Sequence, residues 1–239
     1  RWSAPAVLVT ATLLASCATV PDGPRSKSDP FEPLNRQVFA FNEAVDAAIL
    51  KPVAKGYQQV VPELVRTGVS NFFGNLSDAW STVNFFLQGK VQTGVETFMR
   101  VVASSTFGLG GLMDPASEMG LERRSAEDLG QTLGRWGLPP GPYLVLPLLG
   151  PSDIRDGVGL VADLKATQPG HVFHDVPSRN SAAALQVVDT RVRLFAADRV
   201  LEGIALDKYL AVRSAYLSRR RSLVYDGDPP EEDDSAAAP

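Results

Sequence analysis

The two histidines of this 239-residue sequence are its clearest candidates for metal or proton chemistry. His171 and His174 are three positions apart, a spacing that could place both on one helical face as metal ligands. Pro169-Gly170 before them and Pro177 after them disfavour a stable helix. We therefore interpret both histidines as polar loop residues.

Three aspartates and a glycine-rich segment are the next candidates. Asp153, Asp156 and Asp163 could form a cation site, but their spacing matches no calcium-binding loop, so we expect them on a solvated helix face. Leu109-Gly110-Gly111 lacks the preceding strand and the spacing of a dinucleotide-binding loop. No G-x-S-x-G sequence marks a hydrolase nucleophile. The sequence therefore predicts a protein that is not an enzyme and has no metal site and no cofactor.

The only cysteine closes a short apolar segment at the start of the chain. Arg1 supplies a positive charge, residues 4–15 are mostly small and apolar, and the segment ends in Leu14-Ala15-Ser16-Cys17. Such a stretch is typical of a secretory signal, whereas a transmembrane helix needs about 20 apolar residues. A single cysteine forms neither an internal disulfide nor a Cys-based zinc site, and the alternative is an incidental buried cysteine.

Leu14-Ala15-Ser16-Cys17 resembles the lipobox of bacterial lipoproteins. The resemblance implies that residues 1–16 are a lipoprotein signal peptide and that Cys17 is acylated and becomes the mature N-terminus. In such lipoproteins an Asp at the next position favours inner-membrane retention, so Ala18 is compatible with the outer membrane. We expect residues 17–28 to form the lipidated N-terminus and a linker.

Composition limits what the remainder of the chain can be. A net charge of −4 argues against nucleic acid as the main partner, and 44% hydrophobic residues are sufficient for a core. We expect one folded unit over residues 29–225. The acidic, Pro- and Ala-rich residues 226–239 have no periodicity and are expected to be a disordered tail.

Helical periodicity dominates the expected folded unit. Asp29-Pro30 is a predicted helix start, Lys51-Pro52 a predicted helix end, and Ser125 with Asp128 an approximate capping box. Gly137 is a plausible C-cap for the short helix that follows this box. No alternating pattern indicates a sheet, so we predict the all-α class. The expected helices lie at 30–51, 62–76, 80–87, 91–102, 129–136, 178–197 and 207–224.

Pairs of adjacent phenylalanines are unusual for a plain soluble bundle. Asn71-Phe72-Phe73 and Asn84-Phe85-Phe86-Leu87 each place two rings at neighbouring positions, which cannot both face one narrow apolar stripe. Some rings are therefore expected to point away from a conventional core. A wide buried face is the equally weighted alternative.

The segment from Trp136 to Ser152 has no charged residue and five prolines. Each proline removes a backbone donor, so a continuous helix is excluded, and Tyr143-Leu144-Val145-Leu146 is expected to be extended. A rigid apolar loop at a membrane surface is one interpretation, and a buried structural strap is the other.

Basic residues gather on the last expected helix. Arg219-Arg220-Arg221, with Lys208 and Arg213 on the same helix, could contact lipid phosphates or an acidic partner. A solvated helix face is the alternative, which we favour slightly.

Several long motifs occur in order along the chain: DPFEPLNRQVFAFN (29–42), NFFGNL (71–76), NFFLQGK (84–90), EDLGQTLGRWG (127–137), GPYLVLPLLGPSDIRD (141–156) and RSAYLSRRR (213–221). Together they resemble the VacJ family of outer-membrane lipoproteins, also called MlaA, over about residues 29–228. The chain departs from the family pattern at Val101, where a Phe is usual, and at Ser104, where an Asn is usual.

The resemblance implies a ring-like helical lipoprotein embedded in one membrane leaflet, with an N-terminal lipid anchor on the periplasmic side of the outer membrane. It also implies removal of misplaced phospholipids from the outer leaflet, association with an outer-membrane porin trimer, and transfer to a soluble periplasmic lipid carrier. A passive structural envelope lipoprotein is the alternative, and a phospholipase is disfavoured. The hypothesised phospholipid path comprises Asn71, Phe72, Phe73, Asn75, Phe85, Phe86, Tyr143 and Leu144.

Overall fold

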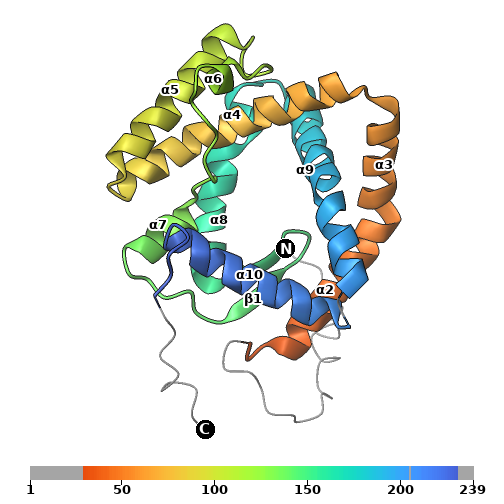
Figure 1. The fold of residues 1–239 in the computed structure, drawn as a ribbon. Helices are drawn as coiled ribbons and strands as arrows, with labels where there is room; N and C mark the ends of the chain where they lie inside the picture. The colour runs from red at the N-terminus through yellow and green to blue at the C-terminus, as the bar shows by residue number, and fades with distance from the viewer. Residues whose placement is uncertain (1–28, 205, 231–239) are drawn as a thin grey trace, which may run out of the picture.

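The helices of the protein are arranged as a ring, as the computed structural model shows for residues 29–204 and 206–230. Helices α4, α9, α10 and α8 follow one another around the ring, while α5 and α6 lie outside α4 (Figure 1). The elements in chain order are α2 (Glu32–Val45), a π-helical turn (Asp46–Leu50), α3 (Lys51–Val60), α4 (Glu63–Leu87), α5 (Val91–Phe107), α6 (Pro115–Glu118), α7 (Leu129–Arg135), β1 (Tyr143–Leu146), β2 (Gly150–Asp153), α8 (Ile154–Thr167), a 3-10 turn (Pro169–His171), α9 (Val176–Ile204) and α10 (Lys208–Val224).

The first two helical segments are continuous, contrary to the predicted helix end at Lys51-Pro52. The chain passes through the π-helical turn and enters α3 with Pro52 in its first turn. Pro52 has no backbone N–H to donate, so the helical hydrogen-bond pattern changes at this point, from the π-helical turn to α3. Lys51-Pro52 therefore marks a change of helix type rather than the end of the helix.

Helix α4 is one helix of 25 residues where the sequence analysis expected two. The apolar stripe shifts between Leu76 and Trp80, which suggested a break. Asp78 and Ser81 lie close to that shift, and both are buried. The prediction was wrong because this face of α4 turns polar side chains towards the protein.

Helix α7 begins at the predicted residue, Leu129, but its N-cap differs from the predicted capping box. Asp128, not Ser125, is its N-cap, and the carboxylate accepts from the Gln131 backbone N–H at 2.8 Å. The C-cap is Trp136, and the predicted Gly137 is the left-handed residue that follows it. Gly137 has a φ of +93°, and its N–H donates to the Gly134 carbonyl at 3.0 Å. A left-handed backbone conformation at this position favours glycine.

A two-stranded antiparallel sheet, which the sequence analysis did not predict, interrupts the helices. Tyr143 pairs with Asp153 and Leu146 with Gly150. Asn35 of α2 extends β1, because its amide accepts from the Val145 N–H at 2.9 Å and donates to the Tyr143 carbonyl at 3.0 Å. Strands this short, completed by a side-chain amide, leave no alternating pattern in the sequence.

The buried apolar core is small and lies where α2, β1 and α10 meet. Tyr143, Val145 and Tyr209 form its centre, and Val38, Phe39, Tyr216 and Leu217 pack against them. No helix among the described residues has both the length and the apolar composition needed to cross a membrane.

Candidate lipid-facing surface and charged interior

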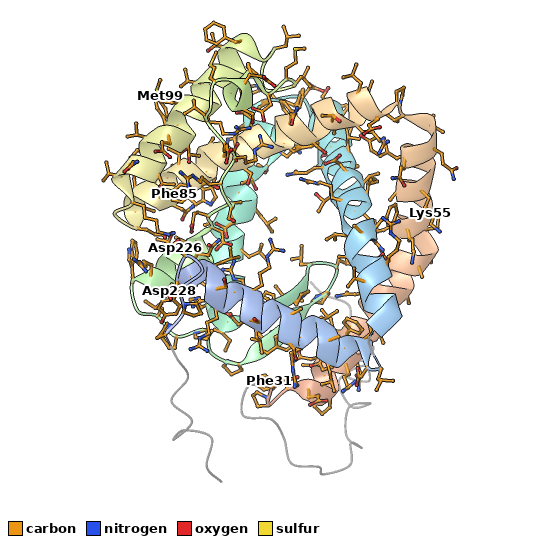
Figure 2. The ribbon with its side chains drawn as sticks, in the orientation of Figure 1. Phe31, Lys55, Phe85, Met99, Asp226 and Asp228 are labelled. Carbon is orange, nitrogen blue, oxygen red and sulfur yellow. The ribbon has the colours of Figure 1, made fainter. Side chains whose placement is uncertain are left out.

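Helix α5 reverses the usual pattern of a soluble amphipathic helix. Its buried residues are mostly small or polar and include the charged Arg100. Its exposed apolar positions between Val91 and Val102 recur at intervals of three and four residues, so these positions form one face. Figure 2 shows Met99 at the outer edge of α5, away from the ring centre. The exposed apolar residues are Val91, Val95, Phe98, Met99, Val102 and Phe107.

Helix α8 has a second exposed apolar face, which is directed towards the ring centre. A Cβ added to Gly159 would lie 2.7 Å from the Gly130 nitrogen, so this position contacts α7. Val161 and Leu164 lie about 200° and 140° further around the helix and point away from α7. Since α7 lies on the outer side of α8 (Figure 1), this face points inwards. It consists of Ile154, Val158, Val161 and Leu164, all exposed.

Charged residues occupy the interior around α10. The Arg220 guanidinium donates to both Asp128 carboxylate oxygens, at 2.6 and 2.9 Å, and forms an ion pair with Asp156. The Tyr216 hydroxyl donates to Asp156 at 2.7 Å. Burial opposes ionisation of Asp156, but the contact with Arg220 outweighs it and lowers the pKa of this carboxyl.

A second ion pair connects the other end of α10 to the start of the described chain. Arg213 donates to the fully buried Asp29 carboxylate at 2.9 Å, and the Tyr209 hydroxyl donates to the same oxygen. Asn35 donates to the other Asp29 oxygen at 2.8 Å. Arg213 and Arg220 therefore tie α10 to the N-terminal segment and to α7 and α8.

Arg100 forms a third charged cluster, between α4, α5 and α6. It is 1% exposed and contacts Asp78, Asp114 and the Ser117 hydroxyl. Burial raises the pKa of Asp78, although Arg123 and Arg100 oppose this shift. The pKa of Asp114 is lowered, because its contact with Arg100 outweighs the effect of burial.

The three aspartates expected on a solvated face belong instead to the interior. Asp153 is 1% exposed and caps α8 by accepting from the Asp156 N–H at 2.8 Å. Burial raises the pKa of Asp153 to about 6. Asp163 accepts from the Trp80 indole and from the Leu129 N–H. The prediction failed because Asp156 and Asp163 have partners distant in sequence, whereas Asp153 is used as the cap of α8.

The basic cluster of α10 is likewise more internal than either interpretation of the sequence allowed. Arg213 and Arg220 are used in the ion pairs above, Lys208 pairs with Glu43, and Arg221 donates to the Pro230 carbonyl. Arg219 is exposed. Periodicity could not separate these roles, because the acidic partners lie on other elements.

Each phenylalanine pair divides between the interior and the surface. Phe73 and Phe85 are buried, whereas Phe86 is exposed. Phe72 is half-buried and contacts Phe73 and Phe173 through its ring. Of these four hypothesised path residues, Phe86 has the most exposed side chain.

The other hypothesised path residues lie in two different places. Asn71 donates to the Leu112 carbonyl at 3.3 Å and the buried Asn75 to the Ser105 hydroxyl at 2.9 Å, so both face α5 and the turn after it. Tyr143 is completely buried in the apolar core, and Leu144 next to it is half-buried. The structure therefore does not gather the eight residues around one cavity.

The proline-rich segment has an exposed part and a buried part. Residues 135–141 are exposed, including Trp136 and Leu138, whereas Tyr143 and Val145 are buried in β1. His171 and His174 lie exposed between α8 and α9, as predicted for loop residues.

Two predictions concern the chain ends. Cys17 and its expected signal peptide lie outside the described residues. Asp226, the first residue of the expected tail, accepts from Lys90, so the folded unit extends at least one residue beyond the predicted boundary. Residues 231–239 are also outside the described part.

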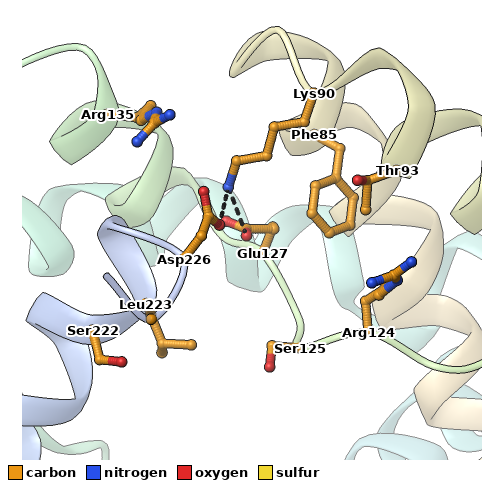
Figure 3. A pocket seen from close by; sticks show the side chains of 11 residues that line it. Phe85, Lys90, Thr93, Arg124, Ser125, Glu127, Arg135, Ser222, Leu223 and Asp226 are labelled. Carbon is orange, nitrogen blue, oxygen red and sulfur yellow. Dashed lines mark hydrogen bonds and ion pairs between the residues drawn. The ribbon is translucent and has the colours of Figure 1, made fainter. Parts of the chain in front are cut away.

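Asp226 borders a pocket of about 540 Å³ between the α4–α5 turn, the strand-like segment before α7 and the end of α10. Figure 3 shows the Lys90 ammonium between the carboxylates of Asp226 and Glu127, with Arg135 and Arg124 on opposite sides. Burial raises the pKa of Glu127, and Gln88 and Lys90 oppose the shift.

A helical ring with apolar side chains on its outer surface and charged pairs in its interior defines a membrane-associated protein, in which residues 29–204 and 206–230 contain no spanning helix. The chain belongs to the MlaA lipoprotein family, whose model matches residues 27–223.

Known proteins of this family are similar over most of their length. The intermembrane phospholipid transport system lipoproteins MlaA of Shigella flexneri and Escherichia coli K12 are 35% and 34% identical over 237 residues, covering 98% of this chain and 93% of each relative. A solved structure reported under "Structural basis for maintenance of bacterial outer membrane lipid asymmetry" matches with a TM-score of 0.71 and 34% identity, covering 84% of this chain and all of that one.

The sequence analysis missed Arg100 as a central residue of the interior. Its signal was present in the spacing of Gly94, Thr97, Arg100 and Ser104, which places small and polar residues on one face of α5. In a soluble helix that face would be assigned to water, and the apolar face to the core.

Proposed function

We propose that the protein is an outer-membrane lipoprotein that removes misplaced phospholipids from the outer leaflet and passes them inwards, and thereby maintains lipid asymmetry. The exposed apolar face of α5 carries the proposal, because large apolar side chains contacting water over such an area are disfavoured. The names of the MlaA relatives, which describe intermembrane phospholipid transport, support it.

The outward face of α5 is proposed to contact acyl chains of one leaflet. Phe98 and Met99 are each 50% exposed, and the nearest charged residue on that side, Glu96, is paired with Arg124. Without a spanning helix among the described elements, seating in a single leaflet satisfies these side chains. Phe86 at the end of α4 extends the same apolar surface.

The phospholipid path is proposed to run through the ring, along the inward face of α8. Val158, Val161 and Leu164 offer an apolar surface to acyl chains, while the charged interior lies beside it on α7 and α10. The hypothesised Asn71 and Asn75 would then adjust the contact between α4 and α5, with Asn75 presenting an amide oxygen that has no partner in the described part of the chain. Of the two hypothesised path residues in β1, Tyr143 is buried and Leu144 is partly exposed.

Two variants test the path. Val161→Asn is expected to slow phospholipid transfer in reconstituted proteoliposomes without altering membrane association, because it adds a polar group only to the inward face. Val95→Asn, on the outward face of α5, is the matched control. Equal transfer by the two variants would show that the path does not run along α8, and no net transfer by the unaltered protein would favour a passive envelope lipoprotein.

The lipid anchor and the partners complete the proposal. Cys17 is proposed to be acylated at the mature N-terminus, where several buried acyl CH₂ groups at about 0.8 kcal/mol each would hold the protein firmly. An unmodified Cys17 in the intact mass of native protein would contradict this. An outer-membrane porin trimer and a soluble periplasmic lipid carrier are proposed partners, to be sought by in vivo cross-linking.

The proposal includes no hydrolysis. His171 and His174 are exposed, and the His171 ring nitrogen lies 2.7 Å from the Lys165 carbonyl. Replacing both by Ala is expected to leave lipid transfer unchanged. Release of fatty acid from labelled phospholipid by the unaltered protein, abolished in this double variant, would overturn the assignment.

A further inference from the structure

The pocket beside Lys90 contains an unused positive charge. Three basic side chains and two acidic ones line it, namely Lys90, Arg124, Arg135, Glu127 and Asp226. Lys90 is neutralised by both carboxylates, and Arg124 pairs with Glu96. Within the described residues the Arg135 guanidinium has no hydrogen-bond or ion-pair partner, so it is the basic group of the lining that remains free to contact an anion.

Apolar side chains lie directly beside this charge. Trp136 follows Arg135, is 55% exposed, and donates its indole N–H to the Leu87 carbonyl at 3.0 Å. Leu87 and Leu138 are also exposed. An exposed tryptophan with a satisfied N–H next to an arginine is typical of the boundary between headgroups and acyl chains.

We propose that this pocket and its apolar neighbours bind one resident phospholipid, whose phosphate contacts Arg135 and whose acyl chain lies over Trp136 and Leu87. The site lies on the outer side of the ring, at the end of α7, and is separate from the transport path along α8 (Figures 1 and 3). A guanidinium pairs well with phosphate oxygens, and the net positive lining complements an anionic group.

The neighbouring contacts leave room for this ligand. Lys90 holds the Asp226 and Glu127 carboxylates together, and neither carboxylate forms an ion pair with Arg135 (Figure 3). Thr93, Ser125 and Ser222 line the remaining wall and offer hydroxyl groups to a headgroup. A free phosphate would contact the same polar groups as a phospholipid headgroup but would make no contact with Trp136. The contribution of Trp136 to binding therefore distinguishes a phospholipid from a free phosphate.

Binding to the full-length purified protein in detergent tests the site, with dihexanoyl phosphatidylglycerol, glycerol 3-phosphate and inorganic phosphate as probes. Arg135→Gln is expected to weaken binding of the lipid about tenfold or more, the effect of losing a hydrogen bond to a charged group. Arg199→Gln, which removes an exposed arginine from α9 on the opposite side of the ring, is the matched control and is expected to change binding less than twofold.

Trp136→Ser separates a lipid site from an anion site. It is expected to weaken the lipid several-fold and to leave glycerol 3-phosphate unchanged, with thermal unfolding confirming that the variant is folded. Equal lipid affinities in Arg135→Gln and Arg199→Gln would overturn the proposal. A lipid affinity that is unchanged in Trp136→Ser would also overturn the proposal. The pocket would then be a site for free phosphate. Both readouts concern this pocket alone, so they stand whether or not lipid passes through the ring.

Discussion

Helices α5 and α10 have the same length, 17 residues, and opposite surfaces. Helix α5 exposes six large apolar residues, whereas only Leu210 among the helical residues of α10 is an exposed large hydrophobic. Both helices turn arginines towards the interior, where Arg100 of α5 is buried and Arg213 and Arg220 of α10 are partly buried. The difference therefore lies in what each helix presents outwards, and it is the basis for proposing that α5 contacts lipid and α10 contacts water.

The comparison also shows how a protein with a small apolar core is held together. Around α10, Tyr143 and Tyr209 pack beside ion pairs. Around α5, buried Arg100 contacts two aspartates, while the apolar side chains that would normally form a core point outwards. Breaking a buried ion pair by removing one partner is costly, because it leaves the other charge unpaired.

The largest expected effect is on the α5 side of this comparison. Arg100→Leu leaves Asp78 and Asp114 without their buried partner and should lower the free energy of unfolding by about 3–5 kcal/mol. Arg124→Leu is the control, because its ion pair with Glu96 is exposed to solvent and should contribute far less to stability. Chemical denaturation in detergent measures both, and similar losses would contradict a special role for Arg100.

The next effect concerns membrane seating. Phe98→Asp places a charge on the outward face of α5, where an acidic residue costs about 2.5–3.5 kcal/mol at the centre of a bilayer-embedded helix. Membrane association in vesicle flotation should fall while the thermal unfolding temperature in detergent changes little. Ser214→Asp, at an exposed position of α10, should leave flotation unchanged. A Phe98→Asp variant that floats normally would show that α5 does not contact lipid.

A pH effect of about 2–3 kcal/mol is expected around Asp153, on the α10 side. Its pKa of about 6 exceeds that of an unfolded Asp, about 3.9, so the folded protein holds this proton more strongly between those values. The free energy of unfolding should therefore contain a contribution that is full below about pH 4 and lost as the pH rises towards 7.

Asp153→Asn retains a side-chain oxygen that can cap α8 and removes this titration. Its stability should depend less steeply on pH between 4 and 7 than that of the unaltered protein. The measurement is the difference between the two curves, because burial also raises the pKa values of Asp78, Glu127 and Asp163. Parallel curves would show that Asp153 is not titrated in this range.

The smallest expected effect is at the contact between α4 and α5. Asn75→Leu replaces a buried amide that holds Ser105 and packs against Gly111. If Asn75 participates in the lipid path, outer-leaflet phospholipid should increase in cells while membrane association stays normal. Unchanged surface phospholipid would exclude Asn75 from the path.

Most helices could be predicted from the sequence, because apolar residues repeat at helical spacing on whichever side they face. The segments of α5, α9 and α10 were found in this way. The direction of each face could not be predicted, since the exposed Phe98 and the buried Phe73 give the same pattern. The family resemblance, not the periodicity, supplied the expectation of a membrane.

The charged interior could not be predicted from the sequence, for a different reason. Asp29 and Arg213 are separated by most of the chain, and nothing in the residues near either one identifies the other. Hairpin strands completed by Asn35 were missed because a helix side chain supplies the hydrogen bonds that a third strand would normally provide.

Hydroxyl-radical footprinting of the unaltered protein in liposomes tests the assignment of α5 to lipid and α10 to water most directly. Met99 of α5 is 50% exposed and Tyr225, immediately after α10, is 40% exposed, so their geometric accessibility is similar. After correction for intrinsic reactivity, Met99 should be strongly protected in liposomes and Tyr225 oxidised at the rate its exposure predicts. Oxidation of Met99 as fast as that of Tyr225 would contradict the account.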